Sequence, residues 1–339
     1  MKRLNVLLAI LLTVVLSSPT VIAQTRKAGI NGAAFLKIGV GARQVGLGSA
    51  TTSLSGDVTN MYWNPAGIAL GEEHSLQASF TYNKWFADLT QNAVAVSYKL
   101  EGVGTIGVGV MTFGVSDIPS DRDVYSDPLL QAQQIDQIND PTYDYMDLLA
   151  MVSFSRYVTD RLSLGASIKF IREAIDDQAA TAVAFDLGSV YHIGVLNWSI
   201  GARITNLGSD LKFYDYASPI PLTFGIGTSF TPWSNESNNF TVSIDAVKPQ
   251  DGQQFYYAGG EYTFMHMISL RGGYKLNYSG TDDGGASFRP AINTTIEGFT
   301  LGAGFRLPVE EYDLRLDYAF TKMDLLDNVH RVTIQYGMK

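Results

Sequence analysis

The sequence contains no cysteine, so no disulfide can hold this chain of 339 residues together. Charged residues are also scarce, at 17% against about 25% in an average soluble domain. The formal net charge is −9, and an acidic chain does not suit nucleic acid, whose phosphates require a basic face. Beyond the N-terminal region, no stretch approaches the roughly 18 consecutive apolar residues of a membrane helix. These absences exclude a disulfide scaffold, a nucleic-acid-binding protein and a bundle of membrane-spanning helices.

The first residues have the pattern of an export signal. Lys2 and Arg3 are followed by an apolar run over 4–16, and small residues precede Ala23. The pattern predicts a signal peptide over 1–23 that is cleaved after Ala23. An uncleaved anchor helix is the alternative, and it is disfavoured because a span needs roughly 20 apolar residues.

From residue 75 onward the dominant hydrophobic period is two. In 162–170, for example, Leu164 and Ile168 fall on one face and Ser163 and Lys169 on the other. Such segments run for about ten residues, which is the length of a tilted strand that crosses a bilayer. The second face is small and polar, so it suits a water-filled lumen and disfavours a soluble β-sandwich.

Fourteen segments show this alternation, and they are joined alternately by short and long connections. The segments are 75–85, 91–100, 104–114, 146–156, 162–172, 181–191, 195–205, 221–231, 239–248, 254–264, 268–277, 299–307, 312–320 and 330–337. A fifteenth candidate, 286–295, is rejected because it carries Pro290 and would break the order of connections. An open sheet in lipid would leave backbone groups unpaired, so the strands must close. The sequence predicts an all-β protein, a 14-stranded antiparallel transmembrane β-barrel over 75–339 in the outer membrane.

Residues 24–74 precede the first strand and show little alternation. The segment is rich in glycine and fairly apolar, so it would make a poor free tail. A barrel of fourteen strands has a lumen too wide for its own side chains to fill. We therefore predict that 24–74 is a plug inside the lumen, where the turn at Asn64-Pro65 packs against the inner wall.

The stretch 33–69 resembles the start of the PorV/PorQ family of outer-membrane proteins, which is similar to the FadL-type transporters of long-chain fatty acids. The motif residues within the predicted plug are Ala42, Arg43, Gly46, Gly48, Asp57, Asn64, Pro65, Ala66 and Gly67. The C-terminal half matches more loosely, in 270–274, 301–305, 317–319 and His330. The resemblance implies a fourteen-stranded barrel with an N-terminal hatch and, for some members, a part in type IX secretion. PorV-like members carry or hold exported cargo, and PorQ-like members help to anchor a surface attachment complex; both roles stay open.

The predicted plug carries two charges that can be neutralised inside the lumen. Arg43 and Asp57 can pair with each other or with charges on the wall, most of which alternation places on the lumen side. These wall charges are Lys99, Lys169, Asp186, Arg203, Asp245, Arg271, Arg306, Arg315 and Asp317. A static network that satisfies the charges is favoured over a gate that a ligand or partner shifts.

The predicted connection 115–145 is rich in aspartate. It contains Asp117, Asp121, Asp123, Asp127, Asp136, Asp140 and Asp144. A solvated outer loop is the simplest interpretation, and a docking surface for a partner is the functional one. A calcium site is disfavoured because the spacing does not match an EF-hand. The chain has neither paired histidines at metal-ligand spacing nor a Gly-x-Ser-x-Gly elbow, so we expect no cofactor, no metal and no enzyme activity.

Two functions of different classes remain. The first is a secretion (type IX-like) or surface-attachment component that docks partners, such as secreted cargo or secretion-system components, through its outer loops. The second is a FadL-like transporter of hydrophobic molecules such as long-chain fatty acids, which requires an apolar pocket between plug and wall. Outer-membrane lipid surrounds the barrel in both.

Overall fold

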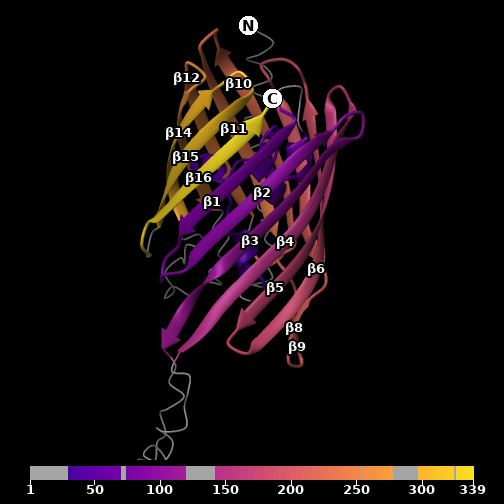
Figure 1. The fold of residues 1–339 in the computed structure, drawn as a ribbon, viewed down its shortest axis with the longest axis vertical. Helices are drawn as coiled ribbons and strands as arrows, with labels where there is room; N and C mark the ends of the chain where they lie inside the picture. The colour runs from indigo at the N-terminus through magenta and orange to yellow at the C-terminus, as the bar shows by residue number, and fades with distance from the viewer. Residues whose placement is uncertain (1–29, 70–73, 120–141, 253, 278–296, 324–325) are drawn as a thin grey trace, which may run out of the picture.

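The computed structural model is a closed β-barrel (Figure 1). It describes residues 30–69, 74–119, 142–252, 254–277, 297–323 and 326–339. The wall consists of β1 (Leu76–Lys84), β2 (Thr90–Leu100), β3 (Gly104–Pro119), β4 (Thr142–Thr159), β5 (Leu162–Ile175), β6 (Gln178–His192), β7 (Ser199–Gly208), β10 (Thr223–Ser234), β11 (Asn238–Pro249), β12 (Phe255–Phe264), β13 (Ile268–Asn277), β14 (Glu297–Pro308), β15 (Tyr312–Met323) and β16 (Val329–Met338). Each strand pairs antiparallel with its neighbours, and β1 pairs with β16 to close the ring.

The fourteen predicted strands are confirmed, and their bounds differ mainly at the ends. The segment predicted from residue 195 starts as β7 at Ser199, because residues 193–198 form the turn before it. β3 and β4 extend into the predicted 115–145 connection, as far as Pro119 and from Thr142. The predicted connection 206–220 contains a small hairpin of β8 (Leu211–Phe213) and β9 (Tyr216–Ser218). The rejected segment 286–295 lies outside the described residues.

Side chains alternate between the outside and the inside of the barrel as the sequence predicts. In β5, Leu164 and Ile168 are 43% and 48% exposed on the outer face, whereas Ser163 and Ser167 are buried inside. The outer face of the other strands is equally rich in exposed aliphatic and aromatic side chains. An apolar belt of this size is not a surface that soluble monomers carry, and it suits lipid. No helix among the described residues is long and apolar enough to cross a membrane.

The two ends of the barrel differ in the connections they carry. At the short end the turns are 101–103, 160–161, 193–198, 235–237, 265–267 and 309–311, and both the start of β1 and the end of β16 lie there. At the long end the connections include 120–141, 209–222 and 278–296, although 176–177 is a tight turn.

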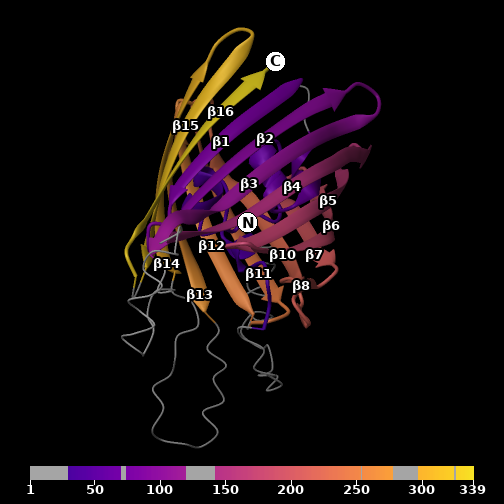
Figure 2. The ribbon, with the colours of Figure 1, turned by 60° about the horizontal axis from the view of Figure 1, so that its bottom comes forward.

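Residues 30–69, called the inner segment below, lie within the ring of strands as the indigo elements of Figures 1 and 2. They form η1 (Ala34–Lys37), α2 (Ala42–Gly46), η2 (Val58–Tyr62) and η3 (Pro65–Ile68). α2 contacts β13–β16, and η3 contacts β4, β5 and β6. Its apolar side chains Phe35, Met61 and Ile68 are fully buried against wall residues such as Met111 and Leu149. The hydrophobic core of the protein therefore lies between the inner segment and the wall.

Candidate functional site

The inner segment begins near the long end of the barrel. The amide of Gly32 donates to the carbonyl of Pro219 at 3.0 Å, just before β10. The amide of Ala33 donates to Glu173 Oε1 at 2.8 Å, near the last residues of β5. Since β1 starts at the short end, the segment between these points runs through the length of the barrel.

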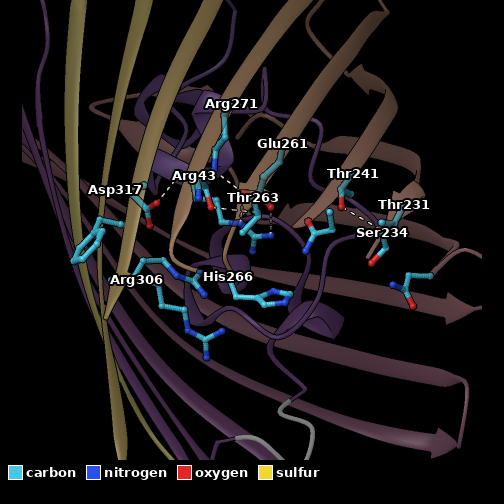
Figure 3. A pocket seen from close by; sticks show the side chains of 16 residues that line it. Arg43, Thr231, Ser234, Thr241, Glu261, Thr263, His266, Arg271, Arg306 and Asp317 are labelled. Carbon is cyan, nitrogen blue, oxygen red and sulfur yellow. Dashed lines mark hydrogen bonds and ion pairs between the residues drawn. The ribbon is translucent and has the colours of Figure 1, made fainter. Parts of the chain in front are cut away.

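Arg43 joins the inner segment to the wall through charge (Figure 3). Its Nε and Nη2 donate to the two oxygens of Glu261 at 3.0 and 2.9 Å. The same carboxylate accepts from Arg271 Nε at 2.5 Å, and Arg271 Nη1 donates to Asp317 Oδ1 at 2.5 Å. The Glu261 carboxylate raises the pKa of Arg43 above its ordinary value, so Arg43 remains charged. A planar guanidinium bound to both oxygens of a carboxylate is a strong and directional contact.

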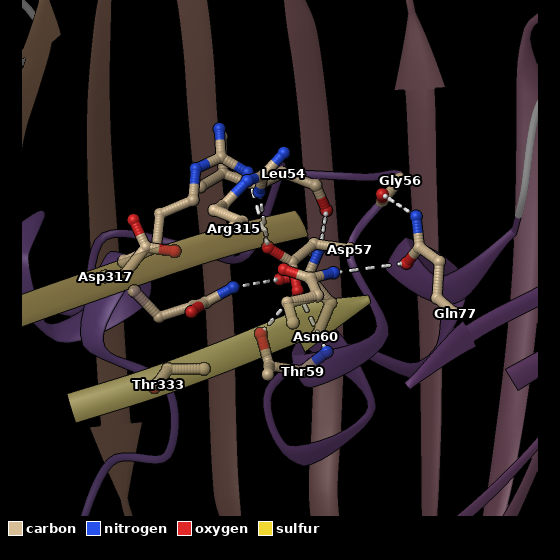
Figure 4. A network of polar contacts seen from close by, with 12 residues as sticks. Leu54, Gly56, Asp57, Thr59, Asn60, Gln77, Arg315, Asp317 and Thr333 are labelled. Atoms are coloured by element: carbon tan, nitrogen blue, oxygen red, sulfur yellow. Dashed lines mark hydrogen bonds and ion pairs between the residues drawn. The ribbon is translucent and has the colours of Figure 1, made fainter. Parts of the chain in front are cut away.

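Asp57 is the second charged attachment (Figure 4). Its Oδ2 lies 3.5 Å from Arg315 Nη1 and 3.6 Å from Arg43 Nη1. Its Oδ1 accepts from the amide and the hydroxyl of Thr59 at 3.0 and 2.6 Å, which caps η2. Burial opposes ionisation, but Arg315, Arg43 and Thr59 together hold the pKa of Asp57 below its usual value. We call Arg43, Asp57, Glu261, Arg271, Arg315 and Asp317 the charge network.

The turn Asn64-Pro65-Ala66-Gly67 packs against the wall without charge. Asn64 caps η3, because its Oδ1 accepts from the amide of Ala66 at 3.1 Å. Its Nδ2 donates to the carbonyls of Thr52 and Ser189, at 2.6 and 3.2 Å. The carbonyl of Ala66 accepts from two wall serines, Ser155 of β4 and Ser163 of β5, each at 3.2 Å. The turn is thus held between β4, β5 and β6.

Glycines on the inner face of the wall let the inner segment approach the strand backbones closely. A Cβ added to Gly165 would lie 2.3 Å from the amide nitrogen of Ala66, and one added to Gly188 would lie 1.8 Å from Asn64 Oδ1. The same holds for further wall positions, which are Gly201, Gly259 and Gly273. Gly272, which points the other way on β13, has nothing within 4 Å of such an atom. The inward glycines are therefore required by the inner segment.

The other predicted motif residues also attach the inner segment to the wall. The amide of Ala42 donates to Thr333 Oγ1 at 2.8 Å. Thr300 Oγ1 accepts from the amide of Gly48 at 3.1 Å and donates to the carbonyl of Gly46 at 3.2 Å. Gly48 has φ +65°, and a Cβ there would lie 2.7 Å from the backbone of β13. Only glycine meets both demands without strain.

Several predicted wall charges do contact the inner segment, and others pair elsewhere. Asp245 Oδ2 accepts from the amides of Thr51 and Thr52 at 2.9 Å each. Arg203 Nη1 donates to the carbonyl of Trp63 at 2.9 Å. Lys169 instead pairs with Asp186 at 2.6 Å within the wall.

Glu261, the partner of Arg43, is absent from the predicted wall charges. Alternation along 254–264 places it on the inner face, so that signal was present in the sequence.

One cavity adjoins the inner segment toward each end of the barrel, and these two share no lining residue. Another cavity toward the short end is bordered by Ser53, Leu54 and Ser55 of the inner segment. The short-end cavity, of about 310 Å³, is polar and is bordered by Arg43, Arg306 and His266 (Figure 3). The long-end cavity, of about 400 Å³, is bordered by Trp63, Trp85 and apolar residues of both inner segment and wall. Within the described residues, no group of three or more histidine or acidic side chains is arranged to hold a metal ion.

The predicted aspartate loop is described only at its two ends. Asp117 lies on β3 and Asp144 on β4, and both are exposed at the long end. The amide of Asp117 donates to Asp144 Oδ1 at 3.0 Å, so these two residues belong to the strand ends and not to a loop. Asp121, Asp123, Asp127, Asp136 and Asp140 lie outside the described residues.

The closed wall and the inner segment define an outer-membrane β-barrel with the fold of FadL-like transporters. The toluene transporter TbuX of Ralstonia pickettii aligns with a TM-score of 0.58 at 14% identity, covering 89% of this chain and 98% of that chain. TodX of Pseudomonas putida, also a toluene transporter, aligns with a TM-score of 0.53 at 12% identity, covering 88% and 96%. A FadL homologue of Pseudomonas aeruginosa gives a TM-score of 0.51 at 10% identity, covering 86% and 96%. At these identities the likeness establishes the fold.

The family follows from the sequence itself. The family model described as type IX secretion system protein PorV matches residues 22–249. The chain belongs to this family. A comparison with curated protein sequences gives no match.

Proposed function

We propose that this protein docks other proteins at the long end of its barrel, as an outer-membrane component of a type IX-like secretion or surface-attachment apparatus. The family match over residues 22–249 is the observation that carries the proposal. Outer-membrane barrels have short periplasmic turns and longer outer loops, so the long end faces the cell exterior. The proposal assigns the protein no catalytic step.

The position of the inner segment favours a docking role and disfavours an open pore. It is attached to the wall by the charge network on one side and by close backbone packing on the other. We infer that residues 24–74 act as a plug, and that residues 1–23 are a signal peptide removed before it forms. Conductance in planar bilayers tests the plug: we expect it to rise when residues 30–69 are deleted. N-terminal sequencing of the purified protein tests the signal peptide: we expect the mature chain to begin at Gln24. Unchanged conductance after the deletion contradicts a plug.

Docking at the long end can be mapped because the chain has no cysteine. Asp144→Cys places a crosslinking site where the aspartate-rich connection ends and β4 starts, and Glu101→Cys places one in an exposed turn at the short end. We expect a cysteine-directed photocrosslinker on whole cells to give protein adducts with Asp144→Cys and not with Glu101→Cys. Adducts to lipid alone, or equal adducts from both sites, would overturn the docking proposal.

A second function, passage of small apolar molecules, is favoured by one observation. The long-end cavity lies between inner segment and wall and is bordered by Trp63, Trp85 and Phe255. Uptake of a labelled apolar compound by cells with and without the gene tests this function. Equal uptake would remove it and leave the docking proposal untouched.

A further inference from the structure

Two cavities lie at opposite ends of the same three strands. One is the long-end cavity, and the other is the cavity of about 380 Å³ that Ser53 borders, here called the Ser53 cavity. β7, β10 and β11 are neighbours in the wall, and each of them borders both cavities. The strand residues at the Ser53 cavity are Ser199, Ser229 and Thr241, and those at the long-end cavity are Thr205, Thr223 and Val247.

Residues 49–53 of the inner segment occupy the strip of wall between these two cavities. Ser49 borders the long-end cavity, and Ser53 borders the other one. Between them the chain lies close against the strands, since a Cβ added to Gly201 would stand 2.1 Å from the carbonyl oxygen of Thr52. We call the contact between residues 49–53 and the inner face of β7, β10 and β11 the seam. It runs from one cavity to the other.

Both sides of the seam carry buried polar atoms that lack a partner. On the inner segment, the hydroxyls of Ser49, Thr51 and Ser53 make no hydrogen bond within the described residues. On β11, the same holds for the hydroxyl of Ser243 and for Oδ1 of Asp245. None of the five residues is more than 1% exposed. Buried polar atoms are nearly always satisfied by protein or by ordered water, so five of them along one strip indicate positions that water occupies.

The spacing of these atoms allows the waters to contact one another. Inward residues that are two apart on a strand, such as Ser243 and Asp245, are separated by about 6.6 Å. A water that bonds to two groups spans nearly the same distance, because each hydrogen bond measures about 2.8 Å. Waters bound to successive polar atoms of the seam can therefore form a continuous row.

From this arrangement we propose that the seam is a single-file path for water between the two ends of the barrel. Water enters the Ser53 cavity from the periplasm, passes the unpartnered hydroxyls one after another and leaves through the long-end cavity. The close approach of Thr52 to Gly201 keeps the seam narrow, and an ion would have to lose its hydration there at high cost. The inference concerns water alone and rests on neither of the two functions proposed above.

The test measures water flow across lipid vesicles that contain the purified full chain. After a sudden rise in external sucrose, light scattering follows how fast the vesicles shrink. We expect vesicles with the native chain to shrink faster than protein-free vesicles of the same lipid and to retain trapped sodium chloride. Equal rates with and without the protein would overturn the inference, and so would release of the salt together with the water.

A pair of serine variants locates the path. Ser243→Val places a branched apolar side chain in the middle of the seam and is expected to return the rate to that of protein-free vesicles. Ser97→Val is the matched control. The Ser97 hydroxyl is just as buried and also lacks a partner among the described residues, but it lies on β2 and borders none of the three cavities. We expect Ser97→Val to keep the native rate.

A second seam variant preserves the packing. Thr51→Val retains the shape of the side chain and removes only a hydroxyl that bonds to no described residue, while the Thr51 amide still donates to Asp245. We expect its rate to lie between those of the native chain and Ser243→Val. All variants are compared at equal content of folded protein, which is measured by gel mobility without heating. If both seam variants are as fast as the native chain, or if Ser97→Val slows the flow as much as they do, water does not follow the seam.

Discussion

The two sides of the inner segment are attached to the barrel by different physical means. Residues 42–57 face β12–β15 through the charge network, in which Arg43 and Asp57 contact Glu261 and Arg315. Residues 58–69 face β1–β6 through backbone carbonyls, serine hydroxyls and glycines without side chains. The charged side depends on complementary ionic partners, and the close-packed side depends on wall glycines that have no side chain.

This contrast determines which mutations weaken each attachment. A buried ion pair that loses one partner leaves the other charge uncompensated. A close backbone contact is insensitive to charge, but it cannot accept an added methyl group without movement of the chain. The predictions below separate the two kinds of attachment, and each can be measured as the free energy of unfolding in urea of the barrel folded in lipid vesicles.

The largest effect is expected from Glu261→Ala. It leaves Arg43 and Arg271 without the carboxylate they share, and we expect a loss of about 3–5 kcal/mol. Thr263→Ala, two residues further along the same face of β12, is the matched control, because Thr263 bonds only weakly to Ser269 at 3.3 Å. Equal stability of the two variants would show that the charge network does not hold the inner segment.

Gly165→Ala, on β5, tests the close-packed attachment of residues 58–69. The added Cβ would lie 2.3 Å from the amide nitrogen of Ala66, so the backbones must separate, and we expect a loss of about 1–3 kcal/mol. Gly272→Ala adds the same methyl group to the outer face of β13, where nothing lies within 4 Å, and should change stability by about 0.5 kcal/mol at most. A loss as large for Gly272→Ala would mean that strand propensity, and not the inner segment, requires glycine here.

A smaller effect is expected at the turn. Asn64→Ala removes the cap of η3, for which we expect a loss of about 0.5–2 kcal/mol, together with the contacts to Thr52 and Ser189. Asn64→Asp keeps the oxygen that accepts from Ala66 but turns a buried carboxylate oxygen toward the carbonyls of Thr52 and Ser189, so we expect it to lose at least as much stability as Asn64→Ala. If Asn64→Asp is as stable as the native chain, the contacts of Nδ2 add nothing.

The smallest effect is expected from acid acting on Asp57. Since the folded pKa of Asp57 lies below its unfolded value of about 3.9, its stabilisation is complete above that pH. As the pH falls below about 4, the unfolded state takes up the proton first and the stabilisation is progressively lost. Asp57→Asn removes this contribution, so the stability difference between the native chain and this variant should shrink below pH 4. A constant difference down to pH 2 would contradict the role assigned to Asp57.

Much of the wall follows from local pattern, and little of the interior does. Alternation identifies β12 and β13 almost to the residue, because a strand with one face in lipid and one in water must alternate. The extension of β3 and β4 was not predicted, since the alternation weakens around the bulge between Val115 and Ile118. The choice of Glu261 as the partner of Arg43 joins positions 218 residues apart, and no local rule selects it among the inward charges.

The sequence by itself determined the strand number, the apolar exterior and the membership of the PorV family, because each depends on residue types read in order. Only the tertiary structure decided which charges neutralise one another and which glycine positions cannot accept a side chain. It also decided that the hydroxyls of Ser49, Thr51 and Ser53 lie along a seam between two cavities without a partner among the described residues. The reason is geometric: ring closure brings distant strands around one inner segment, and each contact there depends on the register of all of them.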